Sequence, residues 1–185
     1  MHNLVWSFAP WLVFMIAARF SSLEFAIGAG VLAALIACGR AAIDARLHLL
    51  DVAGVVYFIG LSAALFLDPN ALESWSQYAQ LGSHVFLMLL VFGSIVVGHP
   101  FTEAYARETT PSAVWGTPEF HAVNRRVSAV WGLALLVGTL SLWAAATIDS
   151  RPILLHMLVP FGALYLAYRY TTAQQPSTDT SVATT

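Results

Sequence analysis

The chain of 185 residues has no lysine, a single cysteine and few charged residues of any kind. All eight basic residues are arginines, and the formal net charge of −2 leaves no basic surface that would favour nucleic-acid binding. The lone cysteine, Cys38, excludes an internal disulfide and a cysteine-based metal cluster within one chain. Charged residues make up 10% of the chain, against about 25% in an average soluble domain.

Apolar residues make up 58% of the chain, and its mean hydropathy is +0.73. A lipid bilayer is the natural solvent for such a composition. The N-terminus lacks the positive region and small-residue cleavage site of a secretory signal, so we expect it to stay as a first membrane segment. The sequence therefore predicts an all-α, polytopic transmembrane helix bundle of about six spans, or five if the first segment lies in the interface.

Six apolar runs carry this prediction. The first, over residues 4–18, is short, because 15 residues of helix rise only about 22 Å against a hydrocarbon core of about 30 Å. The second contains Gly28 and Gly30, small residues that let helices approach closely in lipid. The stretch 39–49 between the second and third runs is expected to be a solvated interfacial turn. The runs cover residues 4–18, 25–38, 52–67, 81–98, 127–148 and 153–170.

The transmembrane domain is predicted over residues 1–170, with a disordered polar tail over 171–185. On six spans, one side of the membrane receives six arginines and the other side two. The positive-inside rule then places both termini and the long polar loop 99–126 in the cytoplasm of a bacterial inner membrane. The six are Arg40, Arg46, Arg107, Arg125, Arg126 and Arg169, and the two are Arg19 and Arg151.

The loop 99–126 gathers charge between two apolar runs and is the candidate interaction loop. Glu103 and Arg107 stand four residues apart, a spacing that favours a pair on one helix. Thr117, Pro118 and Glu119 predict a helix start that leads into the fifth span. We expect either a docking surface for a partner or anionic headgroup, or an interfacial connector. Its candidate residues are His99, Glu103, Tyr105, Arg107, Glu108, Trp115, Asn124, Arg125 and Arg126.

Two histidines inside spans, His84 and His156, are predicted to lie at similar depth near the non-cytoplasmic side. His48 and His99 are both predicted to lie at the cytoplasmic side. Facing histidines could hold haem as axial ligands, or form a pH-sensitive or quinone-like polar site. The third possibility is that they are hydrogen-bonded packing residues. We expect no resident cofactor, with haem as the alternative, and no metal site or catalytic residue.

The layout over about residues 9–170 resembles the intracellular septation protein A family of small inner-membrane proteins. The similarity lies in Pro10 near the start, the arginine-bearing turn at Arg40 and Arg46, the third span ending near Asp68, the fourth ending at Pro100, and the loop leading through Pro118, Phe120 and Asn124 to Trp131. Two features depart from the family pattern and indicate a divergent branch. The loop has the acidic Glu103 and Glu108 where the family is typically more basic, and Trp131 follows Asn124 less closely than in the family.

The resemblance implies a non-enzymatic role in envelope integrity or septation, exerted through protein or lipid interactions. Two alternatives from other classes stay open. One is a membrane redox or cofactor-binding protein that uses His84 and His156. The other is a small transporter or channel subunit, which would have water-accessible polar positions along His84 and Ser94.

Overall fold

A computed structural model describes residues 2–68, 78–148 and 153–174. These residues form helices and connecting turns without a strand, which confirms the all-α class. The elements are α1 (His2–Phe20), α2 (Leu23–Ile43), α3 (Leu49–Leu67), α5 (Ala79–Val96), α6 (Thr102–Arg107), η1 (Ser112–Val114), α7 (Pro118–Thr147), η2 (Leu154–Leu158) and α8 (Val159–Ala173).

Within the described residues, five helices are long and apolar enough to cross a membrane: α1, α2, α3, α5 and α7. The first is longer than the sequence predicted, because α1 continues on both sides of the apolar run to 19 residues. That length corresponds to about 28 Å of helix. A multi-pass membrane protein is therefore consistent with the structure.

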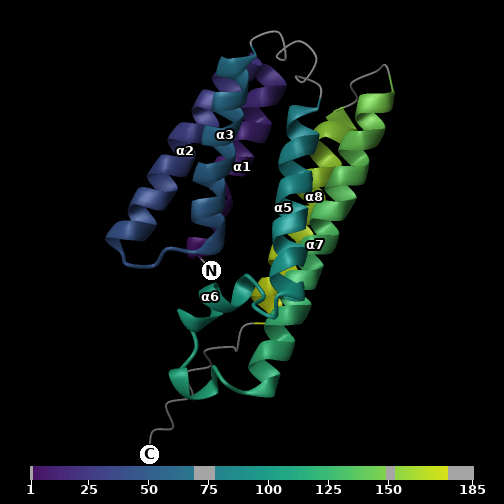
Figure 1. Cartoon of the computed structure of the whole chain (residues 1–185). Helices are drawn as coiled ribbons and strands as arrows, with labels where there is room; N and C mark the ends of the chain where they lie inside the picture. Colours follow the sequence, from purple (N-terminus) through teal and green to yellow (C-terminus); the bar gives the residue numbers. More distant parts are fainter. Residues whose placement is uncertain (1, 69–77, 149–152, 175–185) are drawn as a thin grey trace, which may run out of the picture.

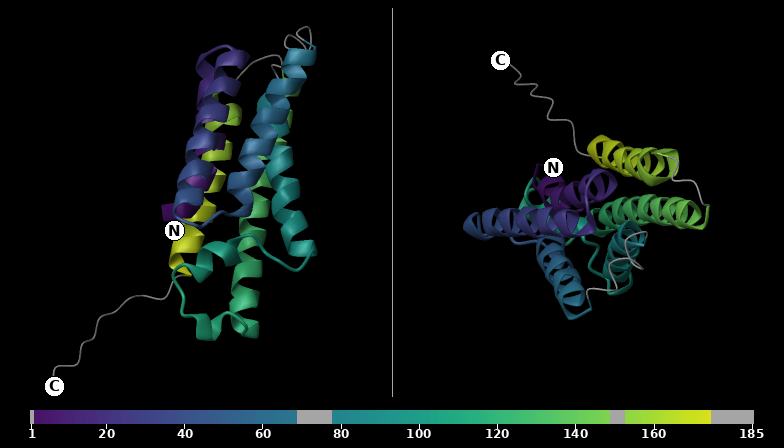
Figure 2. Two further views of the ribbon diagram at one scale, coloured as in Figure 1. Left: turned by 60° about the vertical axis from the view of Figure 1, so that its left-hand side comes forward. Right: turned by 90° about the horizontal axis from the view of Figure 1, so that it is seen from above.

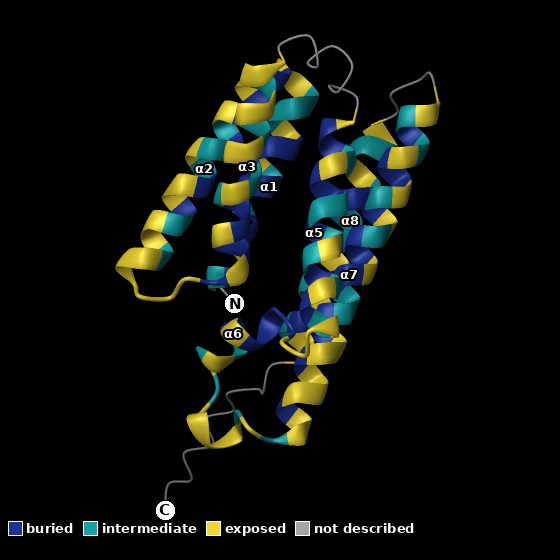
Figure 3. Cartoon of the chain, viewed as in Figure 1, coloured by how far each residue is buried: buried dark blue, intermediate teal, exposed yellow. Residues whose placement is uncertain are grey.

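The long helices form two groups of three. Helices α1, α2 and α3 pack together on one side, and α5, α7 and α8 on the other, with α6 lying at one end of the bundle (Figure 1). The left view of Figure 2 shows the long helices running side by side. Figure 3 shows exposed positions along the outer faces of these helices. Many of them are large and apolar, such as Leu32, Val56, Leu89 and Leu140, as expected for faces covered by lipid.

Aromatic side chains fill the space between the two groups. The buried Trp11 of α1 contacts Tyr57 and Phe58 of α3 and also Phe86 of α5, with ring centroids 4.9, 5.1 and 5.8 Å away. Phe8, one turn earlier on α1, stacks on Trp131 of α7 at 4.6 Å. Helix α1 is therefore a central packing element that holds the two groups together.

Local signals set the helix ends near the polar loop as predicted. The Thr117 hydroxyl accepts a hydrogen bond from the Phe120 backbone N–H at 3.2 Å, and Pro118 opens α7. Helix α5 ends at Val96, and Gly98 then adopts a positive φ of 85°, which glycine tolerates, just before Pro100.

Helix α8 is preceded by an irregular turn. Residues Leu154–Leu158 form a π-helical segment, and Pro160 follows it. A proline lacks the N–H that would bond to the carbonyl four residues earlier, here that of His156. The widened turn is the expected response to that missing bond.

Three expectations need correction or lie outside the description. The stretch 39–49 is not a simple solvated turn, because α2 continues to Ile43 and His48 is buried. The predicted tail begins too early, because α8 extends through Ala173. Residues 175–185 and the turn at 149–152 lie outside the described residues.

Gly30 allows close contact between α2 and α3, as the small-residue pattern predicts, whereas Gly28 does not. A Cβ at Gly30 would stand 2.6 Å from Cε1 of the buried Phe58, while a Cβ at Gly28 would meet nothing within 4 Å. We therefore expect Gly30→Ala to lower the free energy of unfolding by about 1–3 kcal/mol, the usual cost of overpacking. Thermal unfolding in detergent measures this effect, and Gly28→Ala is the matched control. Equal stability of the two variants would contradict the contact.

Candidate functional site: the α6 clamps and their pocket

The short helix α6 is bound to α7 by the buried polar side chains of Thr102 and Glu103. The carboxylate of Glu103 lies 2.7 Å from Nδ1 of His121 and 3.6 Å from Nη2 of Arg107. Thr102 donates its hydroxyl to the Asn124 carbonyl oxygen at 2.9 Å. The pair Glu103–Arg107 confirms the i,i+4 spacing read from the sequence, and the contacts of Thr102 and Glu103 to α7 hold the start of α6.

The residue that follows α6, Glu108, is bound to the other group of helices. One carboxylate oxygen lies 2.9 Å from Nε2 of His48, which precedes α3. The Asn3 side chain of α1 donates to both carboxylate oxygens, at 3.0 and 2.9 Å. Glu108 therefore connects the polar loop to α1 and to the start of α3, and these contacts leave its side chain only 12% exposed.

His48 lies between two carboxylates. Its Nδ1 is 3.3 Å from Oδ2 of Asp51, and the same oxygen accepts the His48 backbone N–H at 3.0 Å. A neutral imidazole carries one N–H, so only the doubly protonated ring can donate to Asp51 and Glu108 at once. We call the arrangement Glu108–His48–Asp51, in which each ring nitrogen of His48 faces a carboxylate, the histidine clamp.

Tyr105 of α6 covers the histidine clamp. Its ring stacks on His48 with a centroid distance of 4.1 Å and an interplanar angle of 13°. Burial, reinforced by the carboxylates of Asp51 and Glu108, raises the pKa of the Tyr105 hydroxyl above its usual range. The ring therefore stays neutral and acts as a packing partner of the clamp.

The predicted interaction residues separate into an inward-facing set, an exposed set and the half-buried Trp115. Glu103, Tyr105, Glu108 and Asn124 point into the protein and build the clamps. Trp115 is half-buried, with its Nε1 donating to the Thr110 carbonyl at 3.0 Å and the Arg107 guanidinium 5.6 Å from its ring centroid. The exposed set is His99, Arg107, Arg125 and Arg126.

Sequence reasoning missed several clamp residues. His48 was considered only as a partner of His99, which is exposed, and Asn3, Asp51 and His121 were not singled out. One local signal was available, since an acid three residues after a helix-capping position is the spacing of a capping box, as between His48 and Asp51. Asn3 carries no comparable signal, because its contact to Glu108 spans 105 residues of sequence.

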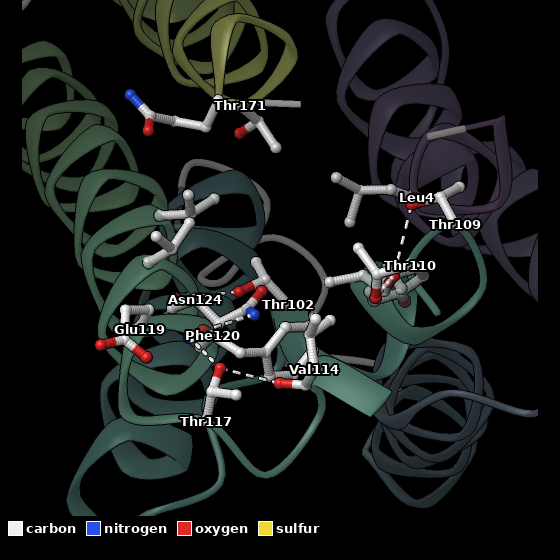
Figure 4. A pocket seen from close by; sticks show the side chains of 15 residues that line it. Leu4, Thr102, Thr109, Thr110, Val114, Thr117, Glu119, Phe120, Asn124 and Thr171 are labelled. Carbon is white, nitrogen blue, oxygen red and sulfur yellow. Dashed lines mark hydrogen bonds between the residues drawn. The ribbon is translucent and has the colours of Figure 1, made fainter. Parts of the chain in front are cut away.

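An open pocket of about 460 Å³ lies beside α6 and is lined by residues of α6, η1, the start of α7, the end of α8 and Leu4 of α1. We call it the α6–α7 pocket. Figure 4 shows Thr102, Thr110, Thr117 and Asn124 among its walls, together with the apolar Val114, Phe120 and Leu4. Its volume and mainly apolar lining are typical of a small-molecule site.

The intramembrane histidines meet at Gln80. His84 Nδ1 lies 3.3 Å from the Gln80 backbone oxygen, and His156 Nδ1 lies 3.3 Å from the Gln80 side-chain oxygen. The Gln80 amide donates to the Met15 carbonyl of α1 at 2.8 Å. Both histidines therefore have hydrogen-bonding partners within the bundle. A visible absorption spectrum of the purified protein with added haem tests the haem hypothesis, which predicts a Soret band.

His84 and Ser94 are both engaged in packing. The His84 ring fills the space beside Gly138, where an added Cβ would stand 2.8 Å from its Cδ2. Ser94 donates to the Val91 carbonyl and accepts the Phe101 backbone N–H at 3.1 Å, so it anchors the chain between α5 and α6. A water pathway along these two positions would have to replace those contacts.

Comparisons with known proteins do not add to this picture. No protein-family model matches the chain, and searches of the curated proteins and of the solved structures find no match.

Proposed function

We propose that this chain is a six-span protein of the bacterial inner membrane that acts without catalysis, supporting envelope integrity or septation by binding a partner protein at its cytoplasmic end. The observation that carries the proposal is the folded state of the polar loop. Its carboxylates of Glu103 and Glu108 are engaged by the chain's own side chains, while Arg107, Arg125 and Arg126 stay exposed. The loop therefore offers a preformed, arginine-bearing surface.

Six spans require that η2 and α8 cross the membrane together. They contain 5 and 15 residues, which gives a rod of about 30 Å, the thickness of the hydrocarbon core. The rod packs against α7 and runs beside it along the bundle (Figure 1). This arrangement supports a sixth span in addition to the five long apolar helices.

The orientation follows from the arginines. The end of α2, α6, the start of α7 and the end of α8 meet at the same end of the bundle (Figure 1), and they carry Arg40, Arg107, Arg125 and Arg169 among them. The positive-inside rule makes this the cytoplasmic end.

Cysteine labelling tests both the orientation and the sixth span. In a Cys38→Ser background, we expect a membrane-impermeant maleimide to label Ser21→Cys and Ile148→Cys from the outside of spheroplasts. Ala113→Cys and Gln174→Cys should react only after permeabilisation, because η1 and the end of α8 are expected to face the cytoplasm. Labelling of residues 148 and 174 from the same side would contradict a sixth span.

The partner should carry an acidic surface that complements the exposed arginines. A photoreactive amino acid at the exposed position Ala122, between those arginines and the clamps, is expected to capture an envelope or division protein in living cells. The control is the same amino acid at Leu133, which is 54% exposed on the apolar part of α7. The same products at both positions, or products that include no envelope or division protein, would contradict the proposal.

A further inference from the structure

The α6–α7 pocket adjoins a groove at the level of the membrane spans. The groove has a volume of about 350 Å³ and lies between α1 and α8, where Phe8, Leu12 and Phe161 line it. Leu4 lines both the groove and the pocket. The pocket and the groove therefore border each other at Leu4.

The pocket is preformed. Its α6 wall is held by Glu103 to His121 at one end and by Glu108 to His48 at the other, at 2.7 and 2.9 Å. Its floor includes Thr171 of α8, whose hydroxyl accepts the Trp131 Nε1–H at 2.9 Å. A ligand entering this pocket does not have to order its walls, which favours binding.

The polar atoms of the lining mainly offer hydrogen-bond acceptors. The hydroxyls of Thr109 and Thr110 already donate to the Ala106 carbonyl, at 3.3 and 2.8 Å, so their oxygens keep only acceptor capacity. The Asn124 amide nitrogen donates to the Phe120 carbonyl at 2.9 Å. The Tyr105 hydroxyl and the Gln174 amide, which also line the pocket, can donate as well as accept, so a donor on the ligand would be complemented by the threonine oxygens and by these two groups.

The charge of the lining also favours a positively charged ligand with hydrogen-bond donors. Among the described residues that line the pocket, Glu119 is the only charged one, and it is exposed. An acid without a neighbouring base in the lining suits a cation, and an ammonium group supplies both the positive charge and the N–H donors.

We propose that the α6–α7 pocket binds the primary ammonium headgroup of a membrane lipid whose hydrocarbon chain lies in the groove between α1 and α8. This inference rests on the sixth span of the proposed function, which the cysteine labelling tests separately. It does not depend on the partner protein, so failure of the photocrosslinking experiment leaves it intact.

Lipid retention tests the headgroup. The full chain is placed in nanodiscs with equal amounts of ethanolamine, choline and glycerol phospholipids that share the same chains, and retained lipid is measured by native mass spectrometry. Ethanolamine and choline lipids both carry a phosphate, but only the ethanolamine headgroup has N–H donors. A difference in retention between these two lipids therefore reports the N–H donors and not the phosphate. We expect the ethanolamine lipid to be enriched about tenfold, the value of one hydrogen bond to a charged group. Equal retention of the three lipids would overturn the proposal.

Two substitutions locate the binding. Val123 lines the pocket, so Val123→Trp should fill it and abolish the enrichment, whereas Val137→Trp, on an outward face of the same helix, should leave it unchanged. Glu119→Gln should reduce the enrichment severalfold without changing thermal stability. Enrichment that survives Val123→Trp, or that Val137→Trp removes equally, would overturn the assignment to this pocket.

Discussion

Replacing His48 with alanine is expected to lower the free energy of unfolding by about 1–3 kcal/mol, the usual cost of leaving a buried hydrogen-bonding group without its partner. The ring nitrogens of His48 face Asp51 at 3.3 Å and Glu108 at 2.9 Å. Without the ring, the buried carboxylate of Asp51 and the carboxylate of Glu108 both lose this hydrogen-bonding partner. Reversible unfolding in mild detergent, followed by circular dichroism, measures the loss.

Arg107→Gln is the matched control for this prediction. It removes the 3.6 Å contact with Glu103, but the Arg107 side chain is 47% exposed and Glu103 keeps His121 as a partner. Exposed pairs contribute at most about 1 kcal/mol, so this variant should remain close to the parent in stability. A loss below about 1 kcal/mol for His48→Ala would show that the histidine clamp does not hold the fold together.

Trp11→Ala is expected to cost about 3–5 kcal/mol, as for other buried large aromatic side chains. Trp11 is 1% exposed and contacts rings from both α3 and α5, so its removal opens a cavity between the two groups of helices. Thermal unfolding in detergent measures the change.

The control for Trp11 is Trp143→Ala, since Trp143 is 58% exposed on α7. Exposed positions usually change stability by no more than about 0.5 kcal/mol. Similar losses for the two tryptophans would show that α1 is not packed between the groups, and would favour an interfacial first segment.

What the sequence predicts well is local. The start of α7 depends on Thr117 and Pro118, and the Glu103–Arg107 pair on one helical turn, so neighbouring residues determine both. The close approach at Gly30 also follows from a small residue in an apolar run, although the sequence does not distinguish it from Gly28.

The candidate site depends on contacts that are remote in sequence. Asn3 and Glu108 are 105 residues apart, and Gln80 and His156 are 76 residues apart. Their pairing results from how the helices pack, which periodicity and composition do not specify. For this reason Glu108, predicted as part of an interaction surface, proves to be an inward-facing clamp residue.

The first helix is longer than its apolar run. Its apolar run is 15 residues, but flanking polar residues such as Asn3 are part of α1 because Glu108 satisfies the Asn3 amide. The polar end of the helix is therefore stabilised by the loop that packs beneath it.

A double-mutant cycle between His48→Ala and Glu108→Ala tests most directly whether the polar loop is clamped to the first three helices. Residues in direct contact within a charged network couple by about 0.5–3 kcal/mol, and the 2.9 Å buried pair should lie in the upper half of that range. We predict a coupling free energy above about 1.5 kcal/mol. Additive losses, with a coupling below about 0.5 kcal/mol, would contradict the clamp.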